Sequence, residues 1–230
     1  MKARYPICAK CSIRACDPHG PVESTKVDLN AGPSFCPMKT RGDALKRASD
    51  EYRKDAVRNF AYYASLQEAQ CFERVDGNLR TKVPRIEETV QFAAKMKYRR
   101  LGLVFCLGLA SEAIALSKII ENRGFELTSV CCKVGGIPKE ELGLRPQEKI
   151  MGPEEYEAMC NPIGQAEVMN SEKPDLVIML GLCVGHDTLF IKYCKCPITV
   201  LASKDRVLAH NPLGALYTSV SPYYGRLRSS

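Results

Sequence analysis

The sequence predicts an α/β fold, in which a Rossmann-like or flavodoxin-like parallel sheet of about four strands follows a helical segment and a small N-terminal cysteine-rich module. Three observations support this fold class. Short apolar runs alternate with helical patterns from Arg99 onward, amphipathic helical patterns fill the preceding stretch, and the first residues are poor in apolar periodicity but rich in Cys, Pro and Gly. We therefore divide the 230-residue chain into 1–41, 42–98 and 99–230.

The cysteine-rich module, residues 1–41, has the spacing C-x2-C-x4-C-x19-C, formed by Cys8, Cys11, Cys16 and Cys36. So few apolar residues cannot form a sizeable hydrophobic core, so we expect a bound metal to stabilise the module. Three close cysteines and a remote Cys-Pro resemble the general pattern of [4Fe–4S] ligands, although not ferredoxin spacing. We therefore expect these four cysteines to bind metal and favour an iron–sulfur cluster. Zinc is the alternative, and a disulfide pair is the least favoured.

The helical segment, residues 42–98, begins with "DALKRASDEYRKDAVRNFAYYASLQEAQ", whose apolar residues recur with helical spacing. The pair Gly77–Asn78 breaks this pattern. A further helix, "PRIEETVQFAAKMKY", starts with Pro84 in its first turn and aligns Ile86, Val90 and Ala93 on one face.

The α/β segment, residues 99–230, contains four apolar runs that we interpret as strands: "LGLVFC", "FELTSVCCKV", "DLVIMLG" and "PITVLA". The helices expected between them are "ASEAIALSKIIENRG", "PIGQAEVMNSE" with Asn161 as N-cap and Pro162 as first residue, and "HDTLFIKYC". Such alternation predicts a parallel sheet with right-handed crossovers and helices on both faces. In a 2-1-3-4 order, the first and third strands are neighbours, so we expect Cys106 and Cys183 to face each other at the carboxyl edge.

Four cysteines fall where the carboxyl edge of that sheet is expected. Cys106 ends the first strand, Cys132 ends the second, Cys160 precedes a helix, and Cys183 follows the third strand. The carboxyl edge holds the binding crevice of doubly wound folds. We choose Cys132 over its neighbour Cys131 because adjacent strand residues point to opposite faces, and the glycine-rich "CKVGG" follows Cys132.

The crevice cysteines suit metal binding because helix N-termini favour thiolates, and thiolates are the ligands of soft metals. We expect Cys106, Cys132, Cys160 and Cys183 to bind a second centre there, for which a second cluster is a candidate. The alternative is that they are buried packing residues, as free cysteines often are. His186 and Asp187 are the best acid/base candidates, and we expect His210 and Lys204, which follow the fourth strand, to matter less.

The formal charge of +7 does not make nucleic acid the favoured partner. Thiolates in a four-cysteine site holding Zn(II) or an oxidised [4Fe–4S] core bring its charge to roughly −2, so two such sites offset about half of the excess. The basic residues also alternate with acids, which indicates a solvated helix face with i,i+4 pairs. No apolar run reaches membrane-spanning length and no signal-peptide h-region is present, so we expect the cytoplasm, where clustered cysteines bind metal or do redox work.

Several strings together resemble a family of bacterial and archaeal proteins known as uncharacterised cysteine-rich metal-binding proteins, a domain of unknown function. They are "CAKCSIRAC", "FCLGLASEA", "CCKVGGIPK", "CNPIGQAEVMN", "GLCVGHDTLF" and "KDRVLAHNP". The resemblance spans nearly the whole chain. It implies metal binding through Cys8, Cys11, Cys16 and Cys36, points to the later cysteine motifs as functional, and supplies no reaction.

The favoured function is therefore an iron–sulfur redox protein, a possible oxidoreductase, with two sites. Its N-terminal cluster would relay electrons to or from a redox partner protein, and its crevice centre would reduce or bind a small molecule. The alternative is a non-enzymatic zinc- or metal-binding adaptor or metallochaperone. A metal-free thiol redox enzyme ranks last, because the α/β segment lacks C-x-x-C.

Overall fold

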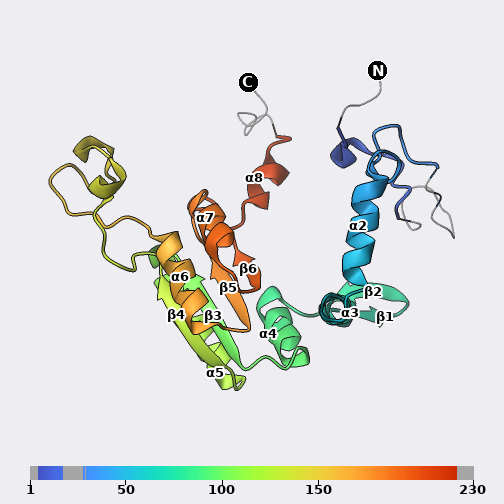
Figure 1. The fold of residues 1–230 in the computed structure, drawn as a ribbon, viewed down its shortest axis with the longest axis horizontal. Coiled ribbons are helices and arrows are strands. Elements are labelled where there is room, and N and C mark those ends of the chain that lie inside the picture. The colour runs from blue at the N-terminus through green and yellow to red at the C-terminus, as the bar shows by residue number, and fades with distance from the viewer. Residues whose placement is uncertain (1–4, 18–27, 29, 222–230) are drawn as a thin grey trace. The chain divides into compact units, whose positions relative to one another are not determined.

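The computed structural model describes residues 5–17, 28 and 30–221 (Figure 1). The chain divides into two compact units, Met1–Leu66 and Gln67–Ser230. Residues 18–27 and 29 of the predicted cysteine-rich module lie outside the described residues. The 3-10 helix and the α-helices that begin in the first unit are η1 (Cys8–Lys10), α1 (Pro37–Thr40), α2 (Gly42–Tyr52) and α3 (Asp55–Gln70).

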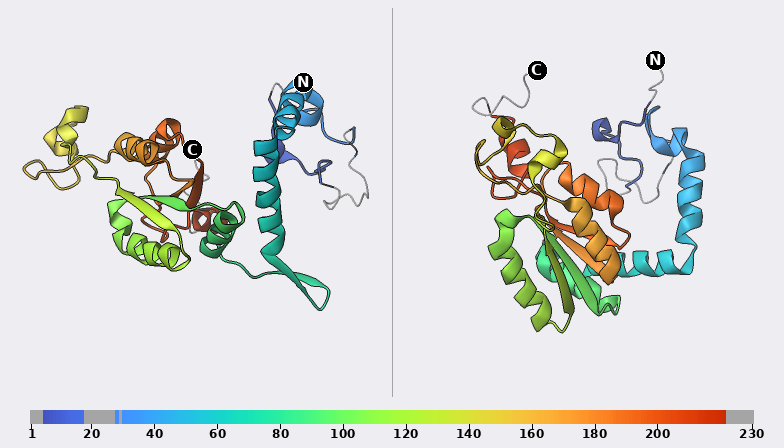
Figure 2. Two further views of the ribbon diagram at one scale, coloured as in Figure 1. Left: turned by 60° about the horizontal axis from the view of Figure 1, so that its bottom comes forward. Right: turned by 60° about the vertical axis from the view of Figure 1, so that its left-hand side comes forward.

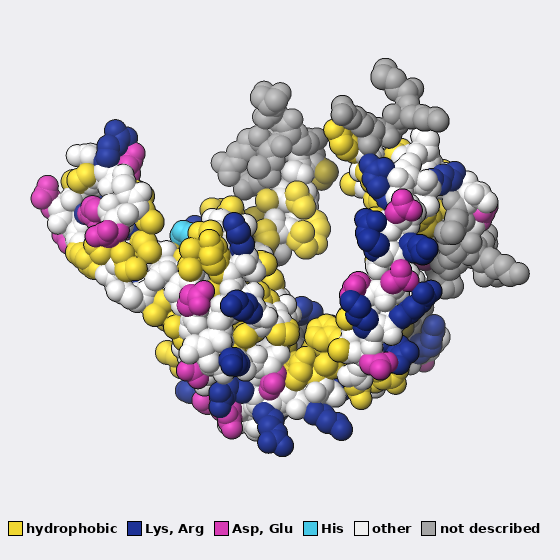
Figure 3. Space-filling view, in the orientation of Figure 1, with side chains coloured by type: hydrophobic (Ala, Val, Ile, Leu, Met, Phe, Trp, Pro, Cys, Tyr) yellow, Lys and Arg dark blue, Asp and Glu magenta, His cyan; other side chains and the backbone are white. Residues whose placement is uncertain are grey.

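The charged residues at the junction of α2 and α3 pair with one another along the helices. Three exposed pairs, all spaced i,i+3, lie at 2.6 to 2.9 Å: Arg53–Asp50, Lys54–Glu51 and Arg58–Asp55. Figure 3 shows basic and acidic side chains interspersed along α2. Such pairs stabilise a helix by about 0.2–0.5 kcal/mol each. They match the predicted solvated helix face, with i,i+3 spacing in place of the expected i,i+4.

The predicted helical segment 42–98 was wrong in its middle, which forms a β-hairpin. Strand β1 (Phe72–Val75) pairs antiparallel with β2 (Asn78–Thr81). The two residues between them, Asp76 and Gly77, have φ of 51° and 80°. Positive φ at both positions defines the tight turn that an Asp-Gly pair favours. The strands escaped prediction because they are mostly exposed and lack alternating apolar residues.

The second unit is built on the four-stranded parallel sheet that the sequence predicts. Its strands are β3 (Arg100–Phe105), β4 (Glu126–Cys131), β5 (Leu176–Leu180) and β6 (Ile198–Ala202). Their order, β4-β3-β5-β6, is the expected 2-1-3-4 arrangement, and every neighbouring pair is parallel. The first strand therefore lies between the second and the third, which brings three carboxyl strand ends side by side.

Helices cover both faces of this sheet (Figure 2). The unit's helices are α4 (Arg85–Lys95), η2 (Leu107–Leu109), α5 (Ala110–Asn122), η3 (Lys139–Leu142), η4 (Pro146–Glu148), α6 (Pro162–Glu172), α7 (His186–Tyr193) and α8 (Leu213–Thr218). Helix α5 lies on one face, and α6 and α7 lie on the other. No helix found in the described ranges combines the length and apolar composition that a membrane crossing requires.

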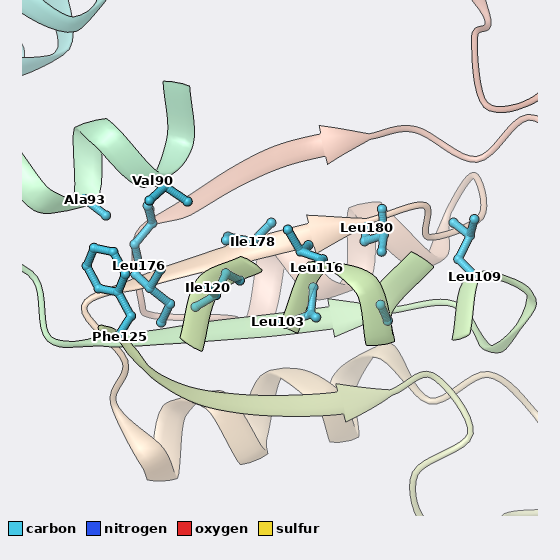
Figure 4. Packing of buried hydrophobic residues seen from close by; sticks show 12 residues of the cluster. Val90, Ala93, Leu103, Leu109, Leu116, Ile120, Phe125, Leu176, Ile178 and Leu180 are labelled. Atoms are coloured by element: carbon cyan, nitrogen blue, oxygen red, sulfur yellow. The ribbon is translucent and has the colours of Figure 1, made fainter. Parts of the chain in front are cut away.

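The core forms two clusters because successive strand residues point to opposite faces. On the α4/α5 face, Leu103 of β3 and Ile178 of β5 pack against Leu116 and Ile120 (Figure 4). On the α6/α7 face, a second cluster joins the strands to both helices; among its members are Val104, Val177, Met169 and Phe190. Cys106 and Cys132 belong to the second cluster, so the crevice cysteines lie on the α6/α7 face.

A long loop connects β4 to α6, and backbone hydrogen bonds join its two ends. The N–H of Lys139 donates to the carbonyl of Glu157 at 3.0 Å, and the N–H of Met159 donates to the carbonyl of Ile137 at 2.7 Å. The Glu157 side chain pairs with Lys139 at 2.6 Å and accepts the backbone N–H of Ile150 at 2.8 Å. These contacts bring the chain back to the sheet immediately before Cys160.

Replacing Ile178 by Val is expected to lower the free energy of unfolding by about 0.5–1.5 kcal/mol, the usual cost of removing one buried methylene group. Ile178 is 1% exposed in the core. Urea unfolding followed by circular dichroism measures the change. Ile150→Val is the matched control, because Ile150 is 80% exposed. Equal losses in the two variants would contradict this account of the core.

Candidate thiol centres

Three cysteines from separate segments meet at the carboxyl edge of the sheet. Cys106 follows β3, Cys132 follows β4, and Cys160 precedes α6. The Cys132 thiol lies close enough to Cys106 and Cys160 for both of them to raise its pKa. The backbone N–H of Leu107 donates to Cys132 Sγ at 3.3 Å. These three sulfurs form what we call the crevice trio.

The backbone explains why the trio assembles. The N–H of Cys132 continues the sheet by donating to the carbonyl of Phe105 at 2.9 Å, and the N–H of Asn161 donates to the carbonyl of Cys132 at 2.7 Å. Asn161 is the predicted N-cap of α6, and its side chain accepts the N–H of Gly164 at 2.8 Å. This cap fixes the turn that holds Cys160 beside Cys132.

Cys183, the fourth predicted crevice cysteine, lies beside the trio without a hydrogen bond to it among the contacts of the described residues. It follows β5, the other neighbour of β3, and its Sγ accepts Nη2–H of Arg206 at 3.0 Å. Burial raises the pKa of Cys183, and the negative charges of Cys106 and Cys160 raise it further, against the lowering effect of Arg206. The strand order thus gathers all four predicted residues in one region.

The three thiols of the trio differ in pKa. Hydrogen bonds to Cys106 and Cys160, followed by burial, raise the pKa of Cys132, so it keeps its proton. The hydrogen bond from Cys132 lowers the pKa of Cys106 to about 4, with smaller contributions from the Gly108 N–H and from Lys204. The same bond lowers the pKa of Cys160 to about 6, helped by the charges of Lys133 and His186. Two thiolates therefore flank one thiol.

The cationic side chains around these sulfurs escaped the sequence analysis. Lys204 hydrogen-bonds to Cys106, and Lys133 and Arg206 act on Cys160 and Cys183. The prediction that Lys204 matters less to the chemistry than His186 stays a prediction, but the loop after β6 brings Lys204 back to the crevice: a Cβ built on Gly108 would lie 3.2 Å from Lys204 Nζ. Their position in the sequence could have indicated this, because Lys204 and Arg206 closely follow the carboxyl end of β6.

The histidines divide into two roles. His186 opens α7 near enough to Cys160 for its charge to lower the pKa of that thiol. Asp187 makes local contacts, accepting the N–H of Thr188 at 2.7 Å. His210 Nδ1 accepts the N–H of Asp205 at 3.1 Å and so holds the loop after β6. Of the two predicted acid/base residues, His186 is the one whose side chain acts on a thiol among the described residues.

The predicted N-terminal ligands gather separately in the first unit. Cys8, Cys11, Cys16 and Cys36 line one cavity of about 120 Å³. Helix η1 places Cys8 and Cys11 together, since the N–H of Cys11 donates to the carbonyl of Cys8 at 3.0 Å. The N–H of Arg14 donates to Cys11 Sγ at 3.4 Å. Within the described part of the chain, no group of three or more His, Cys, Asp or Glu side chains is arranged, as it stands, to hold a metal ion.

The pKa difference between two cysteines predicts a difference in their reactivity in the metal-free, reduced protein. Thiolates are the species that iodoacetamide alkylates. Cys160, with its pKa lowered to about 6, should be alkylated at half its maximal rate near that pH, whereas burial raises the pKa of Cys194 and should shift its half-maximal rate to more alkaline solution. Mass spectrometry of the labelled peptides gives both midpoints. Lys133→Gln should move only the Cys160 midpoint upward, and coinciding midpoints in the wild-type protein would refute this.

Comparisons with known proteins agree on a family and assign no activity. A family model described as "Protein of unknown function (DUF1847)" matches residues 36–201, from the last N-terminal cysteine into β6. An uncharacterized protein of Methanocaldococcus jannaschii is 43% identical over 176 residues, which cover 76% of this chain and 84% of the archaeal protein. Residues 36–201, which the family model matches, contain all four crevice cysteines.

Proposed function

The chain belongs to the DUF1847 family of proteins of unknown function, and on that premise we propose that it is an iron–sulfur redox protein with two cysteine-ligated centres. The observation that carries the proposal is the crevice trio, in which three cysteines from three segments meet at one sheet edge and shift one another's pKa. Thiolates are the ligands that iron–sulfur clusters use. The proposal places the protein in the reducing cytoplasm.

At the crevice, the ligands are Cys106, Cys132, Cys160 and Cys183. Binding would draw Cys183 toward the trio and release the proton of Cys132, because a coordinating thiol is deprotonated. The Leu107 N–H and the Arg206 guanidinium already donate to sulfurs of this set. Such donors stabilise negative charge on ligand sulfurs and tune the reduction potential of a cluster.

At the N-terminal site, the ligands are Cys8, Cys11, Cys16 and Cys36. They line one cavity of about 120 Å³, which supports a single shared centre. The preference for a cluster over zinc rests on the spacing of three close cysteines and a remote Cys-Pro. The proposed task of this site is to exchange electrons with a redox partner protein.

His186 gives the crevice a proton donor. It lies close enough to Cys160 for an electrostatic effect and opens α7 at the same sheet edge. A cluster bound there would supply single electrons, and His186 would supply the proton that accompanies reduction of a small molecule. Asp187, which bonds locally to Thr188, would hold the start of α7 in place.

Two other functions make different predictions. A zinc adaptor or metallochaperone would use the same cysteines to hold a colourless ion. A metal-free thiol enzyme would use the Cys106–Cys132 contact, which supplies the paired thiols that the missing C-x-x-C motif does not.

Metal analysis of the full chain purified without oxygen separates the three functions. We expect a brown protein with broad visible absorbance and with iron and acid-labile sulfide in equal amounts. A colourless protein containing zinc would favour the adaptor, and a protein that folds but binds neither metal would leave the thiol enzyme. Either of these outcomes would overturn the iron–sulfur proposal.

A further inference from the structure

Three basic side chains converge on the crevice thiols without an acidic partner. Lys204 Nζ and Cys106 Sγ both lie beside Gly108, where an added Cβ would be 3.2 Å from the first and 4.0 Å from the second. Arg206 donates to Cys183 Sγ at 3.0 Å, and the charge of Lys133 acts on Cys160. Among the ion pairs of the described residues, none joins any of the three to a carboxylate. Cations without a carboxylate partner, at a sheet edge that is the usual binding crevice, point to a negatively charged ligand.

The loop after β6 is built to hold two of these cations in place. Asp205 lies between Lys204 and Arg206, but its carboxylate accepts the backbone N–H groups of Val207 and Leu208 at 3.0 and 2.9 Å. The N–H of Asp205 in turn donates to His210 Nδ1 at 3.1 Å. The acid between the two cations is therefore engaged by its own turn, and the turn fixes where both cations emerge.

Lys204 and Arg206 keep hydrogen-bond donors that the thiols do not use. Arg206 is exposed, and a guanidinium offers five N–H donors, of which one goes to Cys183. Lys204 offers three donors. A carboxylate or phosphate could therefore accept hydrogen bonds from both side chains while Arg206 keeps its contact with Cys183, and a planar guanidinium binds either group in a bidentate manner.

We propose that the crevice binds a small oxyanion, a carboxylate or a phosphate, through Lys204 and Arg206 beside the cysteine sulfurs. This inference deepens the proposed function, on which it rests: the oxyanion is the small molecule that the crevice centre binds or reduces. Lys133, whose ammonium donates to the carbonyl of Ala158, adds positive potential near Cys160.

The test is anion titration of the full chain, prepared without oxygen, at constant ionic strength set by chloride. Inorganic phosphate and acetate are the two probes, and calorimetry measures their dissociation constants. We expect one of them to bind in preference to chloride, and which one binds tells phosphate recognition from carboxylate recognition. Lys204→Gln and Arg206→Gln should each weaken that binding at least tenfold. Lys118→Gln, which removes an exposed lysine of α5, should leave it unchanged.

Metal analysis of the same samples keeps this inference separate from the proposed function. Anion binding by a protein without metal would overturn the proposed function and leave the oxyanion site standing. A metal-loaded wild-type protein that binds neither probe above chloride would overturn the oxyanion site, with the cations serving only to offset the thiolates. Weakening shared by Lys118→Gln would reveal general charge screening and would also overturn it. Because Arg206 is exposed, its variant provides a test even if Lys204→Gln fails to fold.

Discussion

Replacing Cys132 by Ala is expected to remove the metal of the crevice while leaving that of the N-terminal site. Cys132 is the sulfur that hydrogen-bonds to both other members of the trio, and it is 2% exposed. Its loss removes a central ligand and, in the metal-free protein, the hydrogen bonds that favour thiolates at Cys106 and Cys160. We expect iron and sulfide to fall to about half of the wild-type content, since one of two similar clusters is lost.

Cys131→Ala is the matched control for this variant. Cys131 is the last residue of β4 and packs against the same core cluster as Cys132, but it is not among the residues that shift the pKa of any member of the trio. Both variants remove one sulfur from the same strand end, and circular dichroism should show that both fold. Full metal content in Cys132→Ala, or equal loss in Cys131→Ala, would show that the trio is not a metal site.

Replacing Cys11 by Ala is expected to release the N-terminal metal and to make the cysteine-rich module sensitive to protease. Cys11 lines the four-cysteine cavity together with Cys8, which η1 holds beside it. None of the helices η1, α1 and α2 contains a buried residue, so a metal would be their main cross-link. Structural zinc contributes about 10–16 kcal/mol to comparable small modules, which indicates how much such a segment can depend on its metal.

Limited proteolysis of the full chain, read by mass spectrometry, measures this effect. The α/β unit should remain intact in the same digest, because its core does not involve these cysteines. Ser12→Ala is the control, since Ser12 is the exposed neighbour of Cys11. If Cys11→Ala were digested no faster than Ser12→Ala, the idea that a metal stabilises this segment would be wrong.

The sheet could be predicted because its signals are strong and local. Buried parallel strands appear as unbroken apolar runs, such as Leu176–Leu180, in which every residue is buried. Asn161 and Pro162 marked the start of α6 through capping chemistry alone. The order 2-1-3-4 predicts Cys106 opposite Cys183. In the structure Cys106 interacts most strongly with Cys132, at the end of its other neighbouring strand, and Cys183 accepts a hydrogen bond from Arg206.

The features that escaped prediction depend on exposure or on loop conformation. The hairpin at Asp76–Gly77 has little apolar surface, so its Asp-Gly turn was the main available signal and was overlooked. The position of Lys204 depends on how the loop after β6 folds back, which is set by the hydrogen bonds of Asp205 and His210. No periodicity in the sequence records such contacts.

The central claim, that the α/β crevice binds a metal of its own, is tested most directly in a full chain whose N-terminal ligands Cys8, Cys11, Cys16 and Cys36 are all replaced by Ser. Iron and acid-labile sulfide per chain, measured after purification without oxygen, are the readout. We predict that this variant keeps the metal and visible absorbance of one cluster, and that adding Cys183→Ala lowers or alters them. A folded variant that contains no metal would contradict the claim and leave the N-terminal site as the sole candidate centre.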